Sequence, residues 1–171
     1  MDAIVIGAGI SGIDAAYHLQ THCPNKKFIV LERRQNLGGT WDLFRYPGIR
    51  SDSDMFTFGY EWHPWPSSMV IAPGAEILKY LNECVDAHRL RRHIRFGANV
   101  RSAAWCSVQA RWVVTTANDT VYSSQFLFLC TGYYNYDRPH DPLQDIAGKT
   151  SFLDAGGTVV HPQVQYICCK F

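Results

Sequence analysis

The sequence predicts an α/β fold built on a parallel sheet, and three observations carry this prediction. A short apolar run that starts at Ala3 leads through a glycine-rich turn into helical spacing over residues 11–22. A second apolar run, Lys27–Leu31, follows, so the three segments form a strand–helix–strand unit with parallel strands and a right-handed crossover. A later run, Phe126–Cys130, is continuously apolar and ends at a Thr-Gly pair, which predicts a buried parallel strand that rejoins the same sheet.

The turn after the first strand has the spacing of a phosphate-binding loop. Gly7 permits the tight turn, Gly9 lets the backbone approach a pyrophosphate, and Gly12 lets the helix pack against the strand. The second strand ends in Glu32, about 20 residues beyond the turn, where an acid can hold ribose hydroxyls. Strand, turn, helix, strand and acid in this order predict a dinucleotide site. The alternative is an ordinary strand-to-helix turn.

The composition describes a soluble chain that can bury one sizeable core. Of its 171 residues, 47% are hydrophobic and 18% are charged. A formal charge of +1 with interspersed signs argues against nucleic acid or an anionic membrane and favours a small cofactor. Met1 almost adjoins the first strand, and no apolar run approaches the roughly 20 residues of a transmembrane segment, which predicts a cytoplasmic location. Six cysteines without Cys-x-x-Cys spacing favour reduced thiols over disulfides or a metal site.

The remaining segments differ in character. Residues 33–73 are rich in Gly, Pro, Ser and aromatic side chains, too irregular for a long element, and we expect them to pack over a ligand. Helical spacing returns from Ala75 to Leu90. The stretch from Ile94 predicts short strands, three of which suggest a small antiparallel meander: Val100–Cys106, Arg111–Thr116 and Thr120–Tyr122.

Three further segments make a family resemblance specific. They are Leu37–Asp42 (Leu-Gly-Gly-Thr-Trp-Asp), Arg45–Asp52 (Arg-Tyr-Pro-Gly-Ile-Arg-Ser-Asp) and Leu127–Tyr134 (Leu-Phe-Leu-Cys-Thr-Gly-Tyr-Tyr). Together they resemble the FAD-binding half of flavin-dependent Baeyer–Villiger monooxygenases, in particular the bacterial ethionamide-activating enzymes. The likeness runs from the first strand to about Gln163. It implies a Rossmann-like FAD-binding fold with two dinucleotide-binding domains in the complete protein, and FAD and NADPH as cofactors.

The resemblance also implies a set of cofactor-binding residues at the matching positions. For the FAD pyrophosphate they are three glycines and a serine: Gly7, Gly9, Gly12 and Ser11. Glu32 would hold the adenosine ribose, and the backbone of Val100 would meet the adenine. A further segment would run along the flavin, where a glycine lets the backbone approach closely and an aromatic side chain keeps out water. It comprises Gly39, Thr40, Trp41, Asp42 and Leu43. A segment between the flavin and the nicotinamide cofactor comprises Arg50, Ser51 and Asp52.

Asp52 is also the candidate catalytic residue. The resemblance implies a buried carboxylate that positions a cationic partner near the reacting oxygen, since a buried charge is tolerable only when paired. In the family this partner is an arginine of the later NADP-binding part. The alternative is that Asp52 caps a short helix at Met55–Phe58, a role that Ser51 or Ser53 could share.

Other assignments also have structural alternatives. Trp41 could be an ordinary core aromatic residue, and Glu32 a solvated charge after a strand. Three tyrosines after the last apolar strand either line a cofactor cleft or cover the end of the sheet: Tyr133, Tyr134 and Tyr136. The sequence does not decide between these two roles.

The C-terminal part departs from the family pattern. Gly157–Pro162 resembles the fingerprint of the linker to the NADP domain, but Ala155 stands in place of its phenylalanine and Gln165 in place of its tryptophan. After Gln163 the sequence has no counterpart in the family, as in a truncated or frame-shifted reading. We therefore expect His161 to be a linker histidine without a site to organise.

The sequence thus predicts the N-terminal FAD-binding portion of an NADPH-dependent flavin monooxygenase, with an incomplete FAD-binding domain over 1–154 and a linker remnant and divergent tail over 155–171. In the complete enzyme, a flavin C4a-peroxide would convert a ketone to an ester or oxygenate a sulfide or thiocarbonyl compound. No second glycine-rich turn follows, and these residues do not include the later segment that carries the catalytic arginine in the family, so we do not expect turnover by this chain alone. Two alternatives stay open: a non-catalytic module that binds FAD or an adenine nucleotide, and a non-binding remnant that self-associates or binds proteins through an exposed sheet edge.

Overall fold

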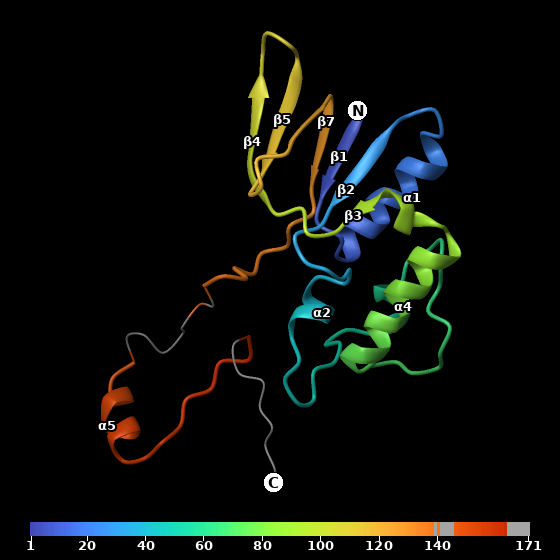
Figure 1. The fold of residues 1–171 in the computed structure, drawn as a ribbon. Helices are drawn as coiled ribbons and strands as arrows, with labels where there is room; N and C mark the ends of the chain where they lie inside the picture. Colours follow the sequence, from blue (N-terminus) through green and yellow to red (C-terminus); the bar gives the residue numbers. More distant parts are fainter. Residues whose placement is uncertain (139, 141–145, 164–171) are drawn as a thin grey trace.

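A four-stranded parallel sheet forms the centre of the molecule (Figure 1). The computed structural model describes residues 1–138, 140 and 146–163. The strands lie in the order β3-β2-β1-β7: Ile94–Arg95, Phe28–Leu31, Ala3–Ile6 and Phe126–Leu129. β1 pairs in parallel with both β2 and β7, so the predicted parallel sheet is confirmed. β3 pairs in parallel with β2, and thus belongs to this sheet rather than to the meander.

Two helices build the main core on one side of the sheet. α1 (Ile10–His22) follows β1, and α4 (Gly74–Ala87) packs against α1 and α2. The apolar residues of α4 recur every three or four positions, so its buried side is Ile77, Leu81, Cys84 and Val85. The helix predicted over Ala75 to Leu90 ends at Ala87, because Arg89 has a left-handed backbone with a φ of 55°. A short 3₁₀ helix, η1 (Leu90–His93), follows.

The other face of the sheet is covered by a separate antiparallel meander (Figure 1). Its strands are β4 (Val100–Cys106), β5 (Arg111–Thr116) and β6 (Val121–Ser124), which confirms the predicted meander. Val114 of β5 is fully buried against a small cluster of side chains from β1 and β2: Ile4, Ile6, Ile29 and Leu31. The meander therefore shields one side of the sheet from water.

β7 differs from its prediction in burial. It is parallel to β1 as expected, but the exposed fractions are 61% for Phe126, 39% for Phe128 and 70% for Leu129. Among the described residues, β7 pairs only with β1, so its outer edge is open. The prediction of a buried strand was wrong, because an unbroken apolar run does not reveal which segments cover it.

The aromatic segment between β2 and α4 contains two single-turn helices, α2 (Thr40–Leu43) and α3 (Met55–Phe58). The Tyr80 hydroxyl of α4 fixes this segment, because it accepts a hydrogen bond from the Tyr60 amide at 2.8 Å and donates one to the His63 carbonyl. Trp62 stacks between the rings of Tyr17 and Tyr60, with centroid distances of 3.9 and 4.4 Å. The segment is thus packed into the core rather than loosely attached.

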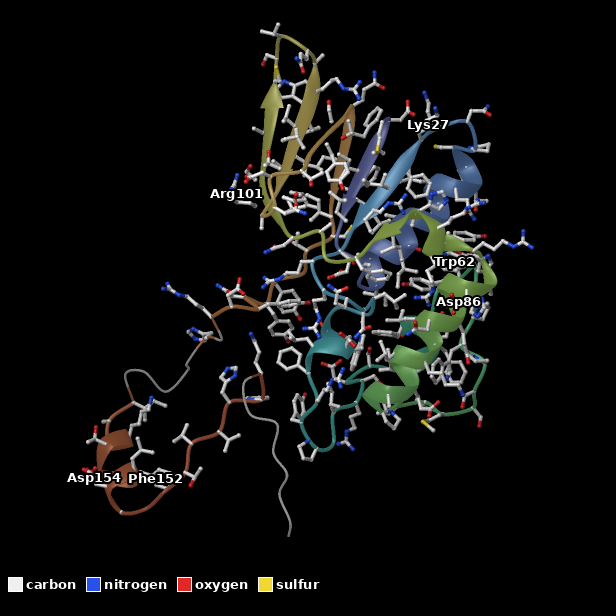
Figure 2. All side chains as sticks on the ribbon, in the orientation of Figure 1. Lys27, Trp62, Asp86, Arg101, Phe152 and Asp154 are labelled. Atoms are coloured by element: carbon white, nitrogen blue, oxygen red, sulfur yellow. The ribbon has the colours of Figure 1, made fainter. Side chains whose placement is uncertain are left out.

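The C-terminal segment extends away from the sheet (Figure 2). Its helix α5 (Lys149–Asp154) has no buried residue, and its Phe152 side chain is 53% exposed. Gln165 and the divergent tail lie outside the described residues, so the predicted domain boundary stays a prediction. The described cysteines, residues 23, 84, 106 and 130, are free thiols. No helix in the described part of the chain is both long and apolar enough to cross a bilayer.

Candidate functional site

A cavity of about 330 Å³ opens at the carboxyl ends of the parallel strands. Residues from five chain segments line it: 6–7 and 9–11 between β1 and α1, 31–33 at the end of β2, 38–41 around the start of α2, 98–100 at the start of β4, and 130–132 and 134–136 after β7. Segments far apart in the sequence meet here because the carboxyl ends of parallel strands share one edge of the sheet. In open α/β sheets, ligands bind at this edge.

The glycine turn is as tight as its spacing predicts. Gly7 has a φ of +102°, and a Cβ on it would lie 2.3 Å from the Cys130 carbonyl oxygen. A Cβ on Gly12 would lie 1.9 Å from the carbonyl oxygen of Gly7. No side chain fits at either position, so these glycines let α1, β1 and the end of β7 approach one another.

The N-terminus of α1 faces the cavity with free amides. Gly9 is the N-cap, so no side chain caps the helix, and its first turn carries no acidic residue. The first intrahelical bond runs from the Ile13 amide to the Gly9 carbonyl, at 3.0 Å. Gly9, Ile10 and Ser11 all line the cavity. Uncapped helix amides that face a cavity form a site for an anion such as a phosphate group.

Glu32 is buried at the end of β2, with an exposed fraction of 5%. Its Oε2 accepts a hydrogen bond from the Ala8 amide at 2.7 Å, and its Oε1 accepts one from the Arg34 amide at 2.8 Å. The interpretation of Glu32 as a solvated charge is therefore wrong. The carboxylate joins the glycine turn to the end of β2, and each oxygen keeps a lone pair for a ligand hydroxyl.

A second glycine pair forms the opposite wall. Gly38 and Gly39 both have positive φ, 113° and 54°, and the Gly38 amide donates to the Ala8 carbonyl at 2.9 Å. A Cβ on Gly39 would lie 3.1 Å from the Cα of Gly9. Thr40 and Trp41 follow and also line the cavity. Trp41 packs against the main core, as the structural alternative predicts, and also lines the cavity. Its role as an aromatic wall beside the flavin stays a prediction.

Asp42 and Leu43 do not line this cavity. The Asp42 carboxylate is buried and accepts hydrogen bonds from Arg34, with Nη2 at 2.6 Å and Nε at 3.1 Å. Arg45 Nη2 lies 3.4 Å from its other oxygen. This network fixes the turn that carries Gly39, Thr40 and Trp41, so Asp42 supports the wall of the cavity from behind.

The predicted segment Arg50–Asp52 also lies outside this cavity. Ser51 is buried and its Oγ accepts a hydrogen bond from the Ala72 amide at 3.0 Å. Asp52 is exposed, so the expected burial of its carboxylate was wrong for this chain. It does not cap α3 either, because Asp54 accepts the hydrogen bond from the Thr57 amide, at 2.9 Å.

The segment after β7 supplies residues that the sequence left undecided. Tyr134 and Tyr136 line the cavity, whereas Tyr133 is 87% exposed and does not.

Two residues that no motif marked, Arg33 and Asn99, line the cavity too. Their position next to Glu32 and Val100, two expected contacts, is the only signal that could have found them.

Comparison with known proteins agrees with this geometry. A family model described as an NAD(P)-binding Rossmann-like domain matches residues 5–71, the part that holds the glycine turn and Glu32. The FAD-containing monooxygenase EthA of Mycobacterium tuberculosis is 47% identical over 166 residues, which cover 95% of this chain and 33% of that protein. The probable FAD-binding monooxygenase AlmA of an Acinetobacter species is 46% identical over 170 residues, again 95% of this chain and 33% of that protein.

Solved structures share the fold. The open crystal structure of cyclohexanone monooxygenase matches with a TM-score of 0.74 and 32% identity, over 84% of this chain and 29% of that one. The OTEMO complex with FAD and NADP matches with a TM-score of 0.74 and 34% identity, over 89% and 28%.

Fold and cavity together are those of a Rossmann-type α/β domain. More narrowly, the chain corresponds to the N-terminal part of the FAD-containing monooxygenases, in agreement with the resemblance found in its sequence. It spans about one third of the length of the curated relatives it matches, 33% in the cases given above.

Proposed function

We propose that these residues bind FAD. The observation that carries the proposal is that one cavity joins the uncapped N-terminus of α1, the buried Glu32 carboxylate and the backbone of Gly38 and Gly39. Helix amides suit a pyrophosphate, and a carboxylate with spare lone pairs suits ribose hydroxyls. Relatives named as FAD-containing, and a solved relative in complex with FAD and NADP, support FAD as the dinucleotide.

The roles of individual residues follow from where they lie. We assign direct contact to the expected residues that line the cavity: Gly7, Gly9, Ser11, Glu32, Gly39, Thr40, Trp41 and Val100. Gly12 and Asp42 act indirectly, by permitting the close helix and by fixing the second glycine turn. For Asp52 the catalytic role stays a prediction, because no arginine of the described residues pairs with its exposed carboxylate.

We further propose that the complete protein is an NADPH-dependent monooxygenase that acts on a ketone or a sulfur compound. Bound FAD would supply electron transfer from NADPH and the activation of oxygen. The residues of this chain would bind the dinucleotide, orient it, and keep water from one side of it with Trp41. We propose that the 171 residues alone do not turn over, because they contain a single glycine-rich turn of this type.

A titration tests both parts of the proposal. FAD is added to the purified chain while quenching of flavin fluorescence is followed, and NADPH is then added in air. Saturable quenching without bleaching of the flavin absorbance supports a site that holds FAD but lacks the reductase part. Absence of quenching contradicts FAD binding and leaves a non-binding remnant, whereas bleaching with oxygen consumption contradicts the claim of incomplete turnover.

The open edge of β7 supports a second proposal, self-association. Phe126 and Leu129 expose 61% and 70% of their surface beside an unpaired strand edge. Such an edge is a template for pairing with another chain. We expect sedimentation analysis to show concentration-dependent oligomers that Phe126→Lys abolishes and Val108→Lys, on the far hairpin, does not. A monomer at all concentrations contradicts this proposal.

The cytoplasmic location remains a prediction of the sequence.

A further inference from the structure

Tyr136 reaches across the cavity from the segment that follows β7. Its half-buried ring lines the same cavity as Glu32 and Gly39. Its hydroxyl oxygen lies 3.8 Å from the position that a Cβ on Gly39 would take, and the same Cβ would lie 3.1 Å from the Cα of Gly9. The phenol oxygen is therefore placed beside the junction of the two glycine turns, where α1 begins.

Two arginines and an ion pair hold Tyr136 in this place. The guanidinium carbon of Arg33 lies 5.7 Å from the centre of the Tyr136 ring, and that of Arg34 lies 5.9 Å from it. Arg33 also donates two hydrogen bonds to Asp137, the next residue, at 2.5 and 3.1 Å. Because a bidentate pair fixes orientation as well as distance, it ties the segment after β7 to the end of β2.

The hydroxyl group of Tyr136 is available to donate a hydrogen bond to a ligand. Within the described part of the chain it makes no hydrogen bond, although the side chain lines the cavity and the oxygen lies close to Gly39. Burial, and then the charge of Glu32, raises the pKa of Tyr136 above its ordinary value of 10.0, so the hydroxyl stays protonated at neutral pH. A protonated phenol beside uncapped helix amides is suited to donate to an anion.

We propose that Tyr136 contacts the bound dinucleotide and that its hydroxyl donates a hydrogen bond to the pyrophosphate, on the side away from α1. This inference rests on the proposed function and adds the residue that completes the anion site. Arg33 and Asp137 are then positioning residues, since they act through the placement of Tyr136 rather than by touching the pyrophosphate.

Calorimetric titration of the whole chain with ADP and with adenosine tests this role, because only ADP carries a pyrophosphate. Tyr136→Phe removes the hydroxyl and keeps the ring. We expect ADP to bind about tenfold more weakly to this variant, the usual effect of losing one hydrogen bond to a charged group, while adenosine binds as to the wild type. Tyr133→Phe is the matched control, because Tyr133 is 87% exposed and does not line the cavity. It should bind both ligands unchanged.

The positioning pair is tested by a double-mutant cycle. Asp137→Asn alone should weaken ADP binding by about threefold, because a neutral partner holds Arg33 less firmly. In the Tyr136→Phe background the same change should have no further effect, since residues that act through one contact are not additive. An equal effect in both backgrounds contradicts a role that operates through Tyr136.

The outcomes separate this inference from the proposed function. If the wild type binds neither ADP nor FAD, the proposed function fails and this inference fails with it. If the wild type binds both but Tyr136→Phe binds ADP equally well, or loses ADP and adenosine to the same degree, this inference alone is wrong. Tighter binding of ADP by Tyr136→Phe would also overturn this inference. It would mean that the Tyr136 hydroxyl occupies the position of the pyrophosphate and does not donate a hydrogen bond to it.

Discussion

Replacement of Glu32 by glutamine should destabilise the fold as well as the site. The carboxylate accepts hydrogen bonds from the Ala8 and Arg34 amides at 2.7 and 2.8 Å, and Glu32 is 5% exposed. A glutamine of the same size keeps one acceptor, but its amide group then faces a backbone N–H, so one buried donor loses its partner. Hydrogen bonds to charged groups contribute about 1.5–3 kcal/mol. We therefore expect the free energy of unfolding of Glu32→Gln to fall by about 2–3 kcal/mol.

Thermal unfolding followed by circular dichroism measures this loss. For a chain of this size, a decrease of about 2–3 kcal/mol lowers Tm by roughly 4–12 °C. Glu61→Gln is the control, since Glu61 is exposed and the same charge is removed there. If Glu32→Gln melts within about 1 °C of the wild type, the two amide contacts do not stabilise the glycine turn, and the argument for a preformed ribose site is wrong.

Two further predictions concern backbone space and pH. Gly7→Ala should abolish folding or lower the free energy of unfolding by more than about 3 kcal/mol, because its Cβ would lie 2.3 Å from the Cys130 carbonyl oxygen. Gly48→Ala is the control, since Gly48 also has a positive φ but nothing lies within 4 Å of its Cβ position. Urea denaturation should show a loss of only about 1 kcal/mol for this control. Burial and the neighbouring His63 lower the pKa of His88 below 6.5, so folding favours its neutral form. The contribution of His88 is therefore complete above about pH 6.5 and is lost as the pH falls through the lowered pKa. The urea midpoint should drop over this range in the wild type but less in His88→Gln, and equal profiles would contradict this assignment.

The glycine turn and Glu32 could be predicted because their roles are local. The positive φ of Gly7 and the close approach at Gly12 depend on the strand and helix that flank them, and both elements directly adjoin the glycine turn in the sequence. Glu32 follows from the same unit, since the end of β2 lies next to the end of β1 in a parallel pair. Sequence spacing is sufficient where one supersecondary unit builds the site.

Asp52, β7 and Tyr136 show where this reasoning stops. Burial of Asp52 and β7 depends on what covers them, and an apolar run or a motif match does not contain that information. Tyr136 lines the cavity beside the Arg33–Asp137 pair, which joins segments 104 residues apart. Contacts of this kind are set by tertiary packing, so the sequence could name the tyrosines but could not choose between their two roles.

FAD retention by the chain and by Gly9→Ala tests the central claim most directly. Gly9 has an ordinary φ of −77°, and a Cβ there would lie no closer than 3.6 Å to Gly39, so the variant should fold while its methyl group fills the phosphate cradle. Both proteins are incubated with excess FAD and desalted, and absorbance is recorded between roughly 300 and 550 nm. The account predicts flavin bands that elute with the wild type and not with folded Gly9→Ala. A colourless wild type, or equal flavin on both proteins, would contradict it.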